Sequence, residues 1–251
     1  LVKNAANAFL ATKISFINAM AELCEATGAD VVALADALGH DARIGRKFLQ
    51  AGLGFGGGCL PKDLRGFMAR AEELGVDQAL EFLREVDDIN LRRRRRAVDV
   101  TTEMLGGEVA GARIAVLGAA FKPDSDDIRD SPALDVAATL HELGALVTVT
   151  DPKALDNARR SRPGPAYVDD VHEAVRDADV VLHLTEWKAF RALDPVELGV
   201  GQPGGHRAQR RPERPGIDGA VRRVALVGED VGALVGVAPA VVVERTGHGA
   251  P

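Results

Sequence analysis

The chain has 251 residues, of which 46% are hydrophobic and 27% are charged, and its formal net charge is −6. This composition predicts a soluble globular protein of one or two domains, long enough to bury a hydrophobic core. The acidic balance argues against nucleic acid as a partner, and no apolar run is long enough to span a bilayer. No secretory signal opens the chain, so we expect a cytoplasmic protein with both cysteines reduced.

Helical periodicity dominates the first hundred residues. Apolar residues recur mostly at three- and four-residue spacing from Phe9 to Leu23, which predicts one long helix over residues 1–27 that ends at Gly28. No N-cap residue precedes this helix, so we expect the chain to begin inside an element. Further helices are predicted over residues 31–38, 64–74 and 78–105.

The second part alternates strands and helices. A buried strand is predicted over residues 113–117, and Ser131 with Pro132 is typical of the start of a helix. Strands are then predicted over residues 145–150 and 180–184, with a helix over 171–176. This order indicates an α/β fold in which a helical domain is followed by a parallel sheet with helices on its faces. Short strands are also conceivable at 224–227 and 241–243.

A glycine-dense run, Gly56-Gly-Gly-Cys59-Leu-Pro61-Lys-Asp63, contains the first candidate site. Glycines beside a thiol leave the backbone open to the close approach of a substrate. A helix that begins near Pro61 would favour a thiolate at Cys59. Asp63 lies one turn further on, and a nucleophile with a nearby carboxylate fits covalent catalysis with assisted hydrolysis. The alternative is a structural cysteine buried in a tight loop.

The same run matches the dinucleotide fingerprint Gly-x-Gly-x-x-Gly at Gly52, Gly54 and Gly57. That fingerprint requires a strand before it and a helix directly after it. Helical sequence precedes these glycines, and Cys59-Leu-Pro follows them. We therefore predict that they do not form an NAD site.

Two further pairs of polar residues are candidates. Lys3 and Asn7 are four residues apart and share one face of the first helix, where they could meet a developing oxyanion; the alternative is a solvated lysine. Lys122 and Arg129 follow the first strand of the sheet, at the edge where such sheets bind ligands. They could meet a diphosphate there, and the alternative is an ordinary charged loop.

Other charged and metal-binding residue types indicate no site. Residues 92–96 are five consecutive arginines within a predicted helix, and we expect them to form a solvated helix face rather than a nucleic-acid site. The six histidines show no metal-ligand spacing, so no metal site is expected. Cys24 lies among helix-core positions and is predicted to be structural.

Four motifs give the chain a resemblance to a known family. Residues 3–18 are similar to the central helix of the UDP-glucose and GDP-mannose dehydrogenases, and residues 54–63 are similar to their nucleophile loop. Residues 118–131 and 185–187 are similar to their C-terminal domain. The resemblance covers residues 1–199, and its motifs occur in the family's order and spacing. It implies a helical dimerisation and catalytic domain over 1–107 and a Rossmann-like UDP-sugar-binding domain over 108–199.

The resemblance also implies a reaction, in which two NAD oxidise the C6 alcohol of a nucleotide sugar to a carboxylate. Cys59 would carry the thiohemiacetal and thioester, Asp63 with Lys3 would assist proton transfer and the hydrolytic water, and Lys3 with Asn7 would stabilise oxyanions. Substrate contacts are implied for Phe55, Gly56, Lys122 and Arg129. Arg43 would reach the sugar site of the partner subunit, which implies a homodimer or a higher homo-oligomer. Lys62 is the one position implied for cofactor contact.

The residues within these motifs favour one substrate. Pro61-Lys62-Asp63 favours UDP-glucose or GDP-mannose over N-acetylated sugars, and residues 41–45 and 185–187 favour UDP-glucose. Gly58 and Leu60 depart from the serine and phenylalanine common in the family. The alternatives are a GDP-mannose 6-dehydrogenase, or a non-catalytic dimerising fragment or pseudogene product.

Two larger departures concern the ends of the resemblance. The family's NAD-binding domain would precede Leu1, so we expect that domain to be missing and the isolated chain to show no turnover. The family's sheet continues with a strand ending in Asp-Gly-Arg, where this chain reads Gly204-Gly-His-Arg-Ala-Gln-Arg-Arg-Pro. A reading-frame shift near Val200 would explain this sequence, and a natural low-complexity tail is the alternative. In either case we expect residues 200–251 to pack badly or stay disordered.

Overall fold

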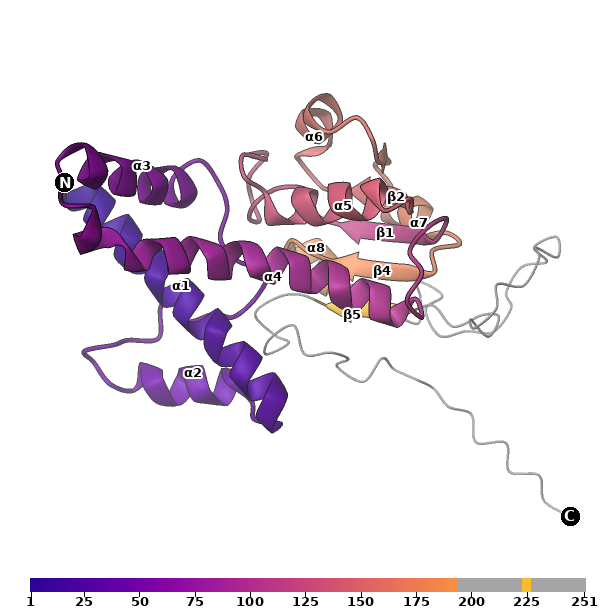
Figure 1. The fold of residues 1–251 in the computed structure, drawn as a ribbon. Coiled ribbons are helices and arrows are strands. Elements are labelled where there is room, and N and C mark those ends of the chain that lie inside the picture. Colours follow the sequence, from indigo (N-terminus) through magenta and orange to yellow (C-terminus); the bar gives the residue numbers. More distant parts are fainter. Residues whose placement is uncertain (194–222, 227–251) are drawn as a thin grey trace, which may run out of the picture.

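The computed structural model of the chain describes residues 1–193 and 223–226 (Figure 1). Its first part is a helical layer built from α1 (Val2–Thr27), α2 (Val31–Gly39), α3 (Leu60–Glu73), a 3₁₀ turn (Asp77–Leu80) and α4 (Phe82–Met104). The predicted helix over 78–105 therefore begins as a separate 3₁₀ turn, and α3 begins four residues before its predicted start. The predicted extent of the first helix is confirmed.

The long helix α1 organises this layer. It ends at Gly28, whose φ of 72° is left-handed, and the amide of Ala29 donates to the carbonyl of Cys24 at 3.0 Å. The C-terminal half of α1 packs on α2 through a buried cluster that includes Ile17 and Cys24. Its N-terminal half packs on α3 and α4 through a second cluster that includes Ala11 and Leu64. The structural role predicted for Cys24 agrees with this burial.

The second part is a parallel sheet with helices on both faces. Its strands are β1 (Arg113–Leu117), β2 (Leu146–Thr150), β3 (Ala166–Tyr167), β4 (Val180–His183) and β5 (Arg223–Leu226), in the order β3-β2-β1-β4-β5. All four pairings are parallel. The connecting helices are α5 (Pro132–Glu142), α6 (Leu155–Ser161), α7 (Val171–Val175) and α8 (Lys188–Arg191). The predicted α/β fold is confirmed.

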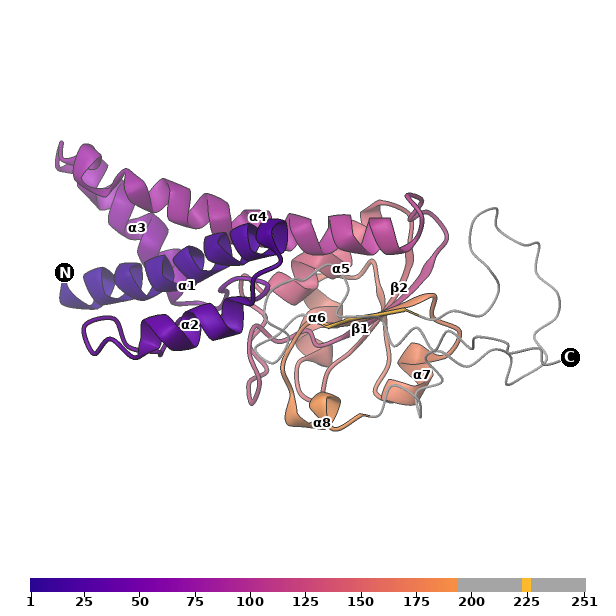
Figure 2. The ribbon, with the colours of Figure 1, turned by 90° about the horizontal axis from the view of Figure 1, so that it is seen from below.

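Helices cover the sheet unevenly. Helix α5 and the C-terminal half of α4 lie over one face, and α7 and α8 lie over the other (Figure 2). Helix α5 begins as predicted, because the hydroxyl of Ser131 accepts from the amide of Leu134 and Pro132 stands in the first turn. The short elements α6, β3 and α8 were not predicted. The strand proposed near residues 224–227 is present as β5, whereas the one at 241–243 and the predicted tail disorder fall outside the described residues.

Helix α4 belongs to both parts of the structure. Its residues Ala97, Val98 and Leu105 are buried in the same cluster as the central strands of the sheet. Its N-terminal half packs on α1. The core of the sheet domain is thus completed by a helix that starts in the helical layer.

The prediction of a solvated face for residues 92–96 was wrong at two positions. Arg93 and Arg94 are buried, whereas Arg95 is exposed. The Nε of Arg93 donates to the carbonyl of Gly52 at 3.2 Å, and burial lowers its pKa despite the nearby Glu25. Arg94 is buried because carboxylates and a carbonyl from distant segments meet its guanidinium. A run of arginines indicates solvent exposure only when such acceptors are absent.

Candidate active site

Cys59 stands at the boundary between the glycine-dense loop and α3. It is the N-cap residue of α3, with Pro61 in the first turn, and its side chain is exposed. Pro61 fits there because the first turn of a helix has no partner for its amides. The positive end of the helix dipole therefore faces any negative charge that develops at this sulfur or on a bound substrate. The structure contradicts the alternative of a buried structural cysteine.

Asp63 brings the first helix to the nucleophile. Its carboxylate Oδ2 lies 3.0 Å from Nζ of Lys3 and accepts from Nδ2 of Asn7 at 2.7 Å. Its own amide donates to the carbonyl of Cys59 at 2.8 Å. Lys3 and Asn7 therefore lie on one face of α1, as predicted, and both contact the carboxylate of Asp63. Asp63 as a residue is only 6% exposed.

The same contacts set the charges of this cluster. The hydrogen bond from Lys3, followed by that from Asn7, holds the pKa of Asp63 below its usual range. The hydrogen bond to Asp63, and then its negative charge, raises the pKa of Lys3. At neutral pH the cluster therefore presents a carboxylate and an ammonium next to Cys59.

The glycine-dense loop is held from two sides. Asn90 of α4 accepts from the amide of Phe55 at 2.6 Å and donates to its carbonyl at 3.0 Å. The amide of Gly57 donates to the carbonyl of Arg129 at 2.8 Å. The loop lies between α2 and α3 with no strand before it, so the dinucleotide fingerprint lacks its structural context.

The predicted diphosphate loop follows β1 and packs on the nucleophile loop. The guanidinium of Arg129 occupies the space that a side chain at Gly58 would need, with its Nη1 2.5 Å from the ideal Cβ position. Hydrogen bonds to Asp127, at 2.6 to 3.1 Å, orient Arg129, and the pKa of its guanidinium is raised mainly by this partner. Lys122 is exposed, with its Nζ 5.3 Å from the ring centre of Phe121. The structure thus brings Arg129 beside Cys59.

Asp151, at the end of β2, is a site residue that the sequence did not reveal. Its Oδ2 accepts from the amides of Ala119 and Ala120 at 2.7 and 3.0 Å and from Nε1 of Trp187 at 3.1 Å. Its Oδ1 accepts from the amides of Lys153 and Ala154 at 2.9 and 2.8 Å. This buried carboxylate therefore fixes the loops that follow β1, β2 and β4. No motif could have shown this role, because the donors come from three separate segments.

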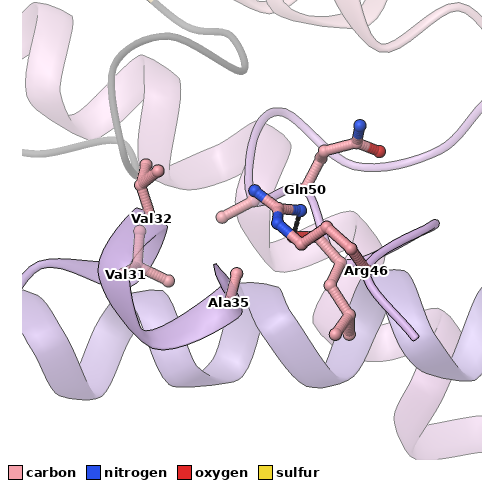
Figure 3. A pocket seen from close by; sticks show the side chains of 7 residues that line it. Val31, Val32, Ala35, Arg46 and Gln50 are labelled. Atoms are coloured by element: carbon pink, nitrogen blue, oxygen red, sulfur yellow. Dashed lines mark hydrogen bonds between the residues drawn. The ribbon is translucent and has the colours of Figure 1, made fainter. Parts of the chain in front are cut away.

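Arg43 and Lys62 are not part of this cluster. Lys62 is exposed in the first turn of α3. Arg43 lies in the loop after α2, where its guanidinium pairs with Asp41 at 2.6 Å. That loop is attached to α2, because Arg46 donates to Asp36 at 2.5 Å and to the carbonyl of Leu49 at 2.6 Å. Figure 3 shows Arg46 over a small depression beside Val31 and Ala35, which contains no residue of the catalytic cluster.

The described part of the chain contains neither a membrane-spanning helix nor a cluster of metal ligands. Within residues 1–193 and 223–226, no helix combines the length and apolar character needed to cross a membrane. Across the same residues, no group of three histidine, cysteine, aspartate or glutamate side chains is arranged to hold a metal ion.

Fold and site together define an α/β protein with a helical layer, a Rossmann-like parallel sheet, and an exposed thiol where the two meet. Residues 1–92 match the central domain of the UDP-glucose/GDP-mannose dehydrogenase family, and residues 115–202 match its UDP-binding domain. The chain belongs to this family.

Individual relatives agree with the family match. The chain is 44% identical over 194 residues to UDP-glucose 6-dehydrogenase of Rhizobium meliloti, covering 77% of this chain and 44% of the relative. It is 44% identical over 199 residues to UDP-glucose 6-dehydrogenase TuaD of Bacillus subtilis, and this match covers 79% of this chain and 42% of the relative. A solved UDP-glucose dehydrogenase structure from Pyrobaculum islandicum matches with a TM-score of 0.73 and 41% identity, covering 77% of this chain and 44% of that one. The chain thus spans less than half the length of these relatives.

Proposed function

We propose that this chain carries the thiol chemistry and the UDP-sugar site of an NAD-dependent dehydrogenase that converts UDP-glucose to UDP-glucuronate. The observation that supports this most directly is the meeting of Lys3 and Asn7 on Asp63, one helical turn from an exposed Cys59. The names of the relatives and of the matched UDP-binding domain support the substrate. A nucleophile that must stay reduced also favours the cytoplasm as the compartment.

Two hydrides leave for NAD in such a reaction. Within residues 1–193 and 223–226, no strand is followed directly by a Gly-x-Gly-x-x-Gly turn that opens a helix, so we assign only the sulfur and proton steps to these residues. In the first sulfur step, the thiolate of Cys59 forms a bond to C6 of the sugar aldehyde, the carbonyl π bond opens, and the carbonyl oxygen becomes an oxyanion. The ammonium of Lys3 and the amide of Asn7 stabilise this negative charge. Loss of the second hydride from C6 of this thiohemiacetal would leave a thioester on Cys59. Lys62 remains our proposal for a residue that contacts the cofactor.

Hydrolysis of the thioester completes the sulfur chemistry. A water oxygen bonds to C6, the C6–sulfur bond breaks, and the sulfur leaves as a thiolate. Asp63 stays ionised at neutral pH, because its hydrogen bonds hold its pKa low. We therefore assign it the orientation of this water and the passage of its proton towards solvent, with Lys3 as electrostatic support.

The sugar nucleotide is proposed to bind across the two loops that meet at Gly58. Lys122 and Arg129 carry positive charge at the carboxyl end of β1, where a diphosphate would lie. Phe55 and Gly56 would offer backbone groups to the sugar.

We also propose that the chain acts as a homodimer through α1. Val2, Phe9, Phe16 and Leu23 are exposed at seven-residue intervals, so they share one side of the helix. Exposed apolar rows of this length mark interaction surfaces. A second copy is the occupant we propose, since α1 can meet its own copy through the same row. Arg43 of one copy would then reach the sugar site of the other.

Protection of Cys59 from alkylation tests the proposed chemistry. We expect the C6 aldehyde of UDP-glucose to slow the reaction of Cys59 with iodoacetamide about tenfold more than UDP-glucose does, because only the aldehyde bonds to sulfur. The buried Cys24 is an internal control, and Lys3→Ala should remove most of the difference. Equal protection by both compounds would contradict covalent chemistry at Cys59. Tighter binding of GDP-mannose would indicate the alternative substrate, and no binding of either nucleotide sugar would indicate a non-catalytic module.

A further inference from the structure

The nucleophile loop is in direct contact with the segment that ends the diphosphate loop. A side chain at Gly56 would bring its Cβ against the carbonyl of Asp130 and to 2.7 Å from Cδ of Pro132. A side chain at Gly57 would bring its Cβ to 2.6 Å from the ring of Phe121. The absence of side chains at these glycines thus lets the two loops pack directly on each other, with the amide of Gly57 donating to the carbonyl of Arg129 at 2.8 Å, so a movement of one loop displaces the other.

Arg94 connects the two loops through its buried guanidinium. Its Nη2 donates to the carbonyl of Phe55 at 3.0 Å. Its Nη1 donates to Oδ1 of Asp130 at 2.7 Å and to the carboxylate of Asp135. A planar guanidinium can serve acceptors in several directions at once, which a lysine ammonium on a flexible stem cannot do in the same geometry.

Asp130 extends this connection to the other side of Cys59. Its Oδ2 accepts from Nη1 of Arg65 at 3.2 Å. Arg65 lies in α3, the helix that starts at Cys59, and also donates to Asp87 at 2.8 and 3.1 Å. The segment before Cys59 and the helix after it are therefore both attached to one residue of the diphosphate loop.

We propose that Arg94, together with Asp130, is a positioning pair that couples occupancy of the diphosphate loop to the reactivity of Cys59. The inference rests on the proposed function, because it takes UDP as the ligand of that loop. A diphosphate drawn to Lys122 and Arg129 stabilises the loop conformation in which Asp130 meets Arg94, and Arg94 then holds the carbonyl of Phe55. Neither residue of the pair needs to contact the reacting atoms.

UDP alone is the probe that isolates this effect, since it lacks the glucosyl group that would cover the thiol. In the full chain, we expect saturating UDP to raise the rate of Cys59 alkylation by iodoacetamide about fivefold or more, within the range of ordinary coupling between sites. Calorimetry measures UDP binding in parallel. Arg94→Lys and Asp130→Asn should still bind UDP, but their alkylation rates should change less than about twofold when it is added.

Arg95→Ala is the matched control, because Arg95 is the neighbouring exposed arginine of the same helix. It should keep the full response to UDP. Asp130→Asn preserves side-chain size at a partly exposed position, so it supplies the test if Arg94→Lys does not fold. A wild-type UDP response in both variants, or no response in a wild-type chain that binds UDP, would overturn the coupling and leave the proposed function standing. A wild-type chain that does not bind UDP would overturn the proposed function and the coupling with it.

Discussion

Replacing Gly57 with alanine should destabilise the chain by about 2–5 kcal/mol. Gly57 has φ of 85°, a left-handed conformation in which a Cβ costs roughly 1–2 kcal/mol. The new methyl group would also lie 2.6 Å from the ring of Phe121, and overpacking of this kind costs roughly 1–3 kcal/mol. Since a domain has a free energy of unfolding of roughly 5–15 kcal/mol, the loss should be large and easily measured.

Equilibrium urea unfolding, followed by circular dichroism, gives the required free energies. Gly66→Ala is the control, because Gly66 lies in α3 with open space around its Cβ position and should gain about 0.5–1 kcal/mol. In a double-mutant cycle, Phe121→Ala should relieve part of the penalty by removing the ring. A Gly57→Ala chain within about 0.5 kcal/mol of wild type, or a cycle without coupling, would refute the packing argument.

Three further perturbations test other parts of the site and its surroundings. Asp63→Asn should lower the melting temperature most at neutral pH, because the pKa of Asp63 is lower in the folded state than in the unfolded chain. The ionised Asp63 therefore stabilises the fold above the unfolded-state pKa of about 4, and this stabilisation is lost as the pH falls through the folded-state pKa. A difference in melting temperature that stays constant from pH 7 to pH 2 would contradict this. The double variant Phe9→Asp and Phe16→Asp should weaken the dimer more than tenfold in analytical ultracentrifugation, because each phenylalanine buried in the interface contributes roughly 1.5–3 kcal/mol. Unchanged dimerisation would exclude α1 as the interface. Phe82→Asp, at an exposed phenylalanine of another helix, is the control. Asp151→Asn should lower the free energy of unfolding by about 3 kcal/mol, since the new side-chain nitrogen cannot accept the hydrogen bonds that one carboxylate oxygen now accepts from backbone amides. A loss below about 1 kcal/mol would show that Asp151 does not organise the three loops.

The elements of the fold were largely accessible from the sequence because they depend on local patterns. Apolar spacing and Gly28 determine the extent of α1, and Ser131 with Pro132 determines the start of α5. Helical spacing also sufficed to place Lys3 and Asn7 on one face. The short α6 and α8 were missed because four to seven residues show no helical period.

The connections within the site were not accessible, because their partners are distant in sequence. Lys3 and Asp63 are brought together by the packing of α1 on α3, which no spacing encodes. Arg94 was expected in solvent, since its acceptors at Phe55, Asp130 and Asp135 belong to separate segments. The substrate and homodimer roles of Arg43 and Lys122 stay predictions.

The shared position of α4 has a consequence for how the two parts of the chain unfold. A fragment starting at residue 108 would lose Ala97, Val98 and Leu105, and with them one side of the hydrophobic core beneath the sheet. Helix α4, with 23 residues, is about 35 Å of continuous hydrogen-bonded backbone. A hinge between the family's two domains would therefore have to break hydrogen bonds within this helix. Heat or denaturant should therefore melt the helical layer and the sheet in a single cooperative step.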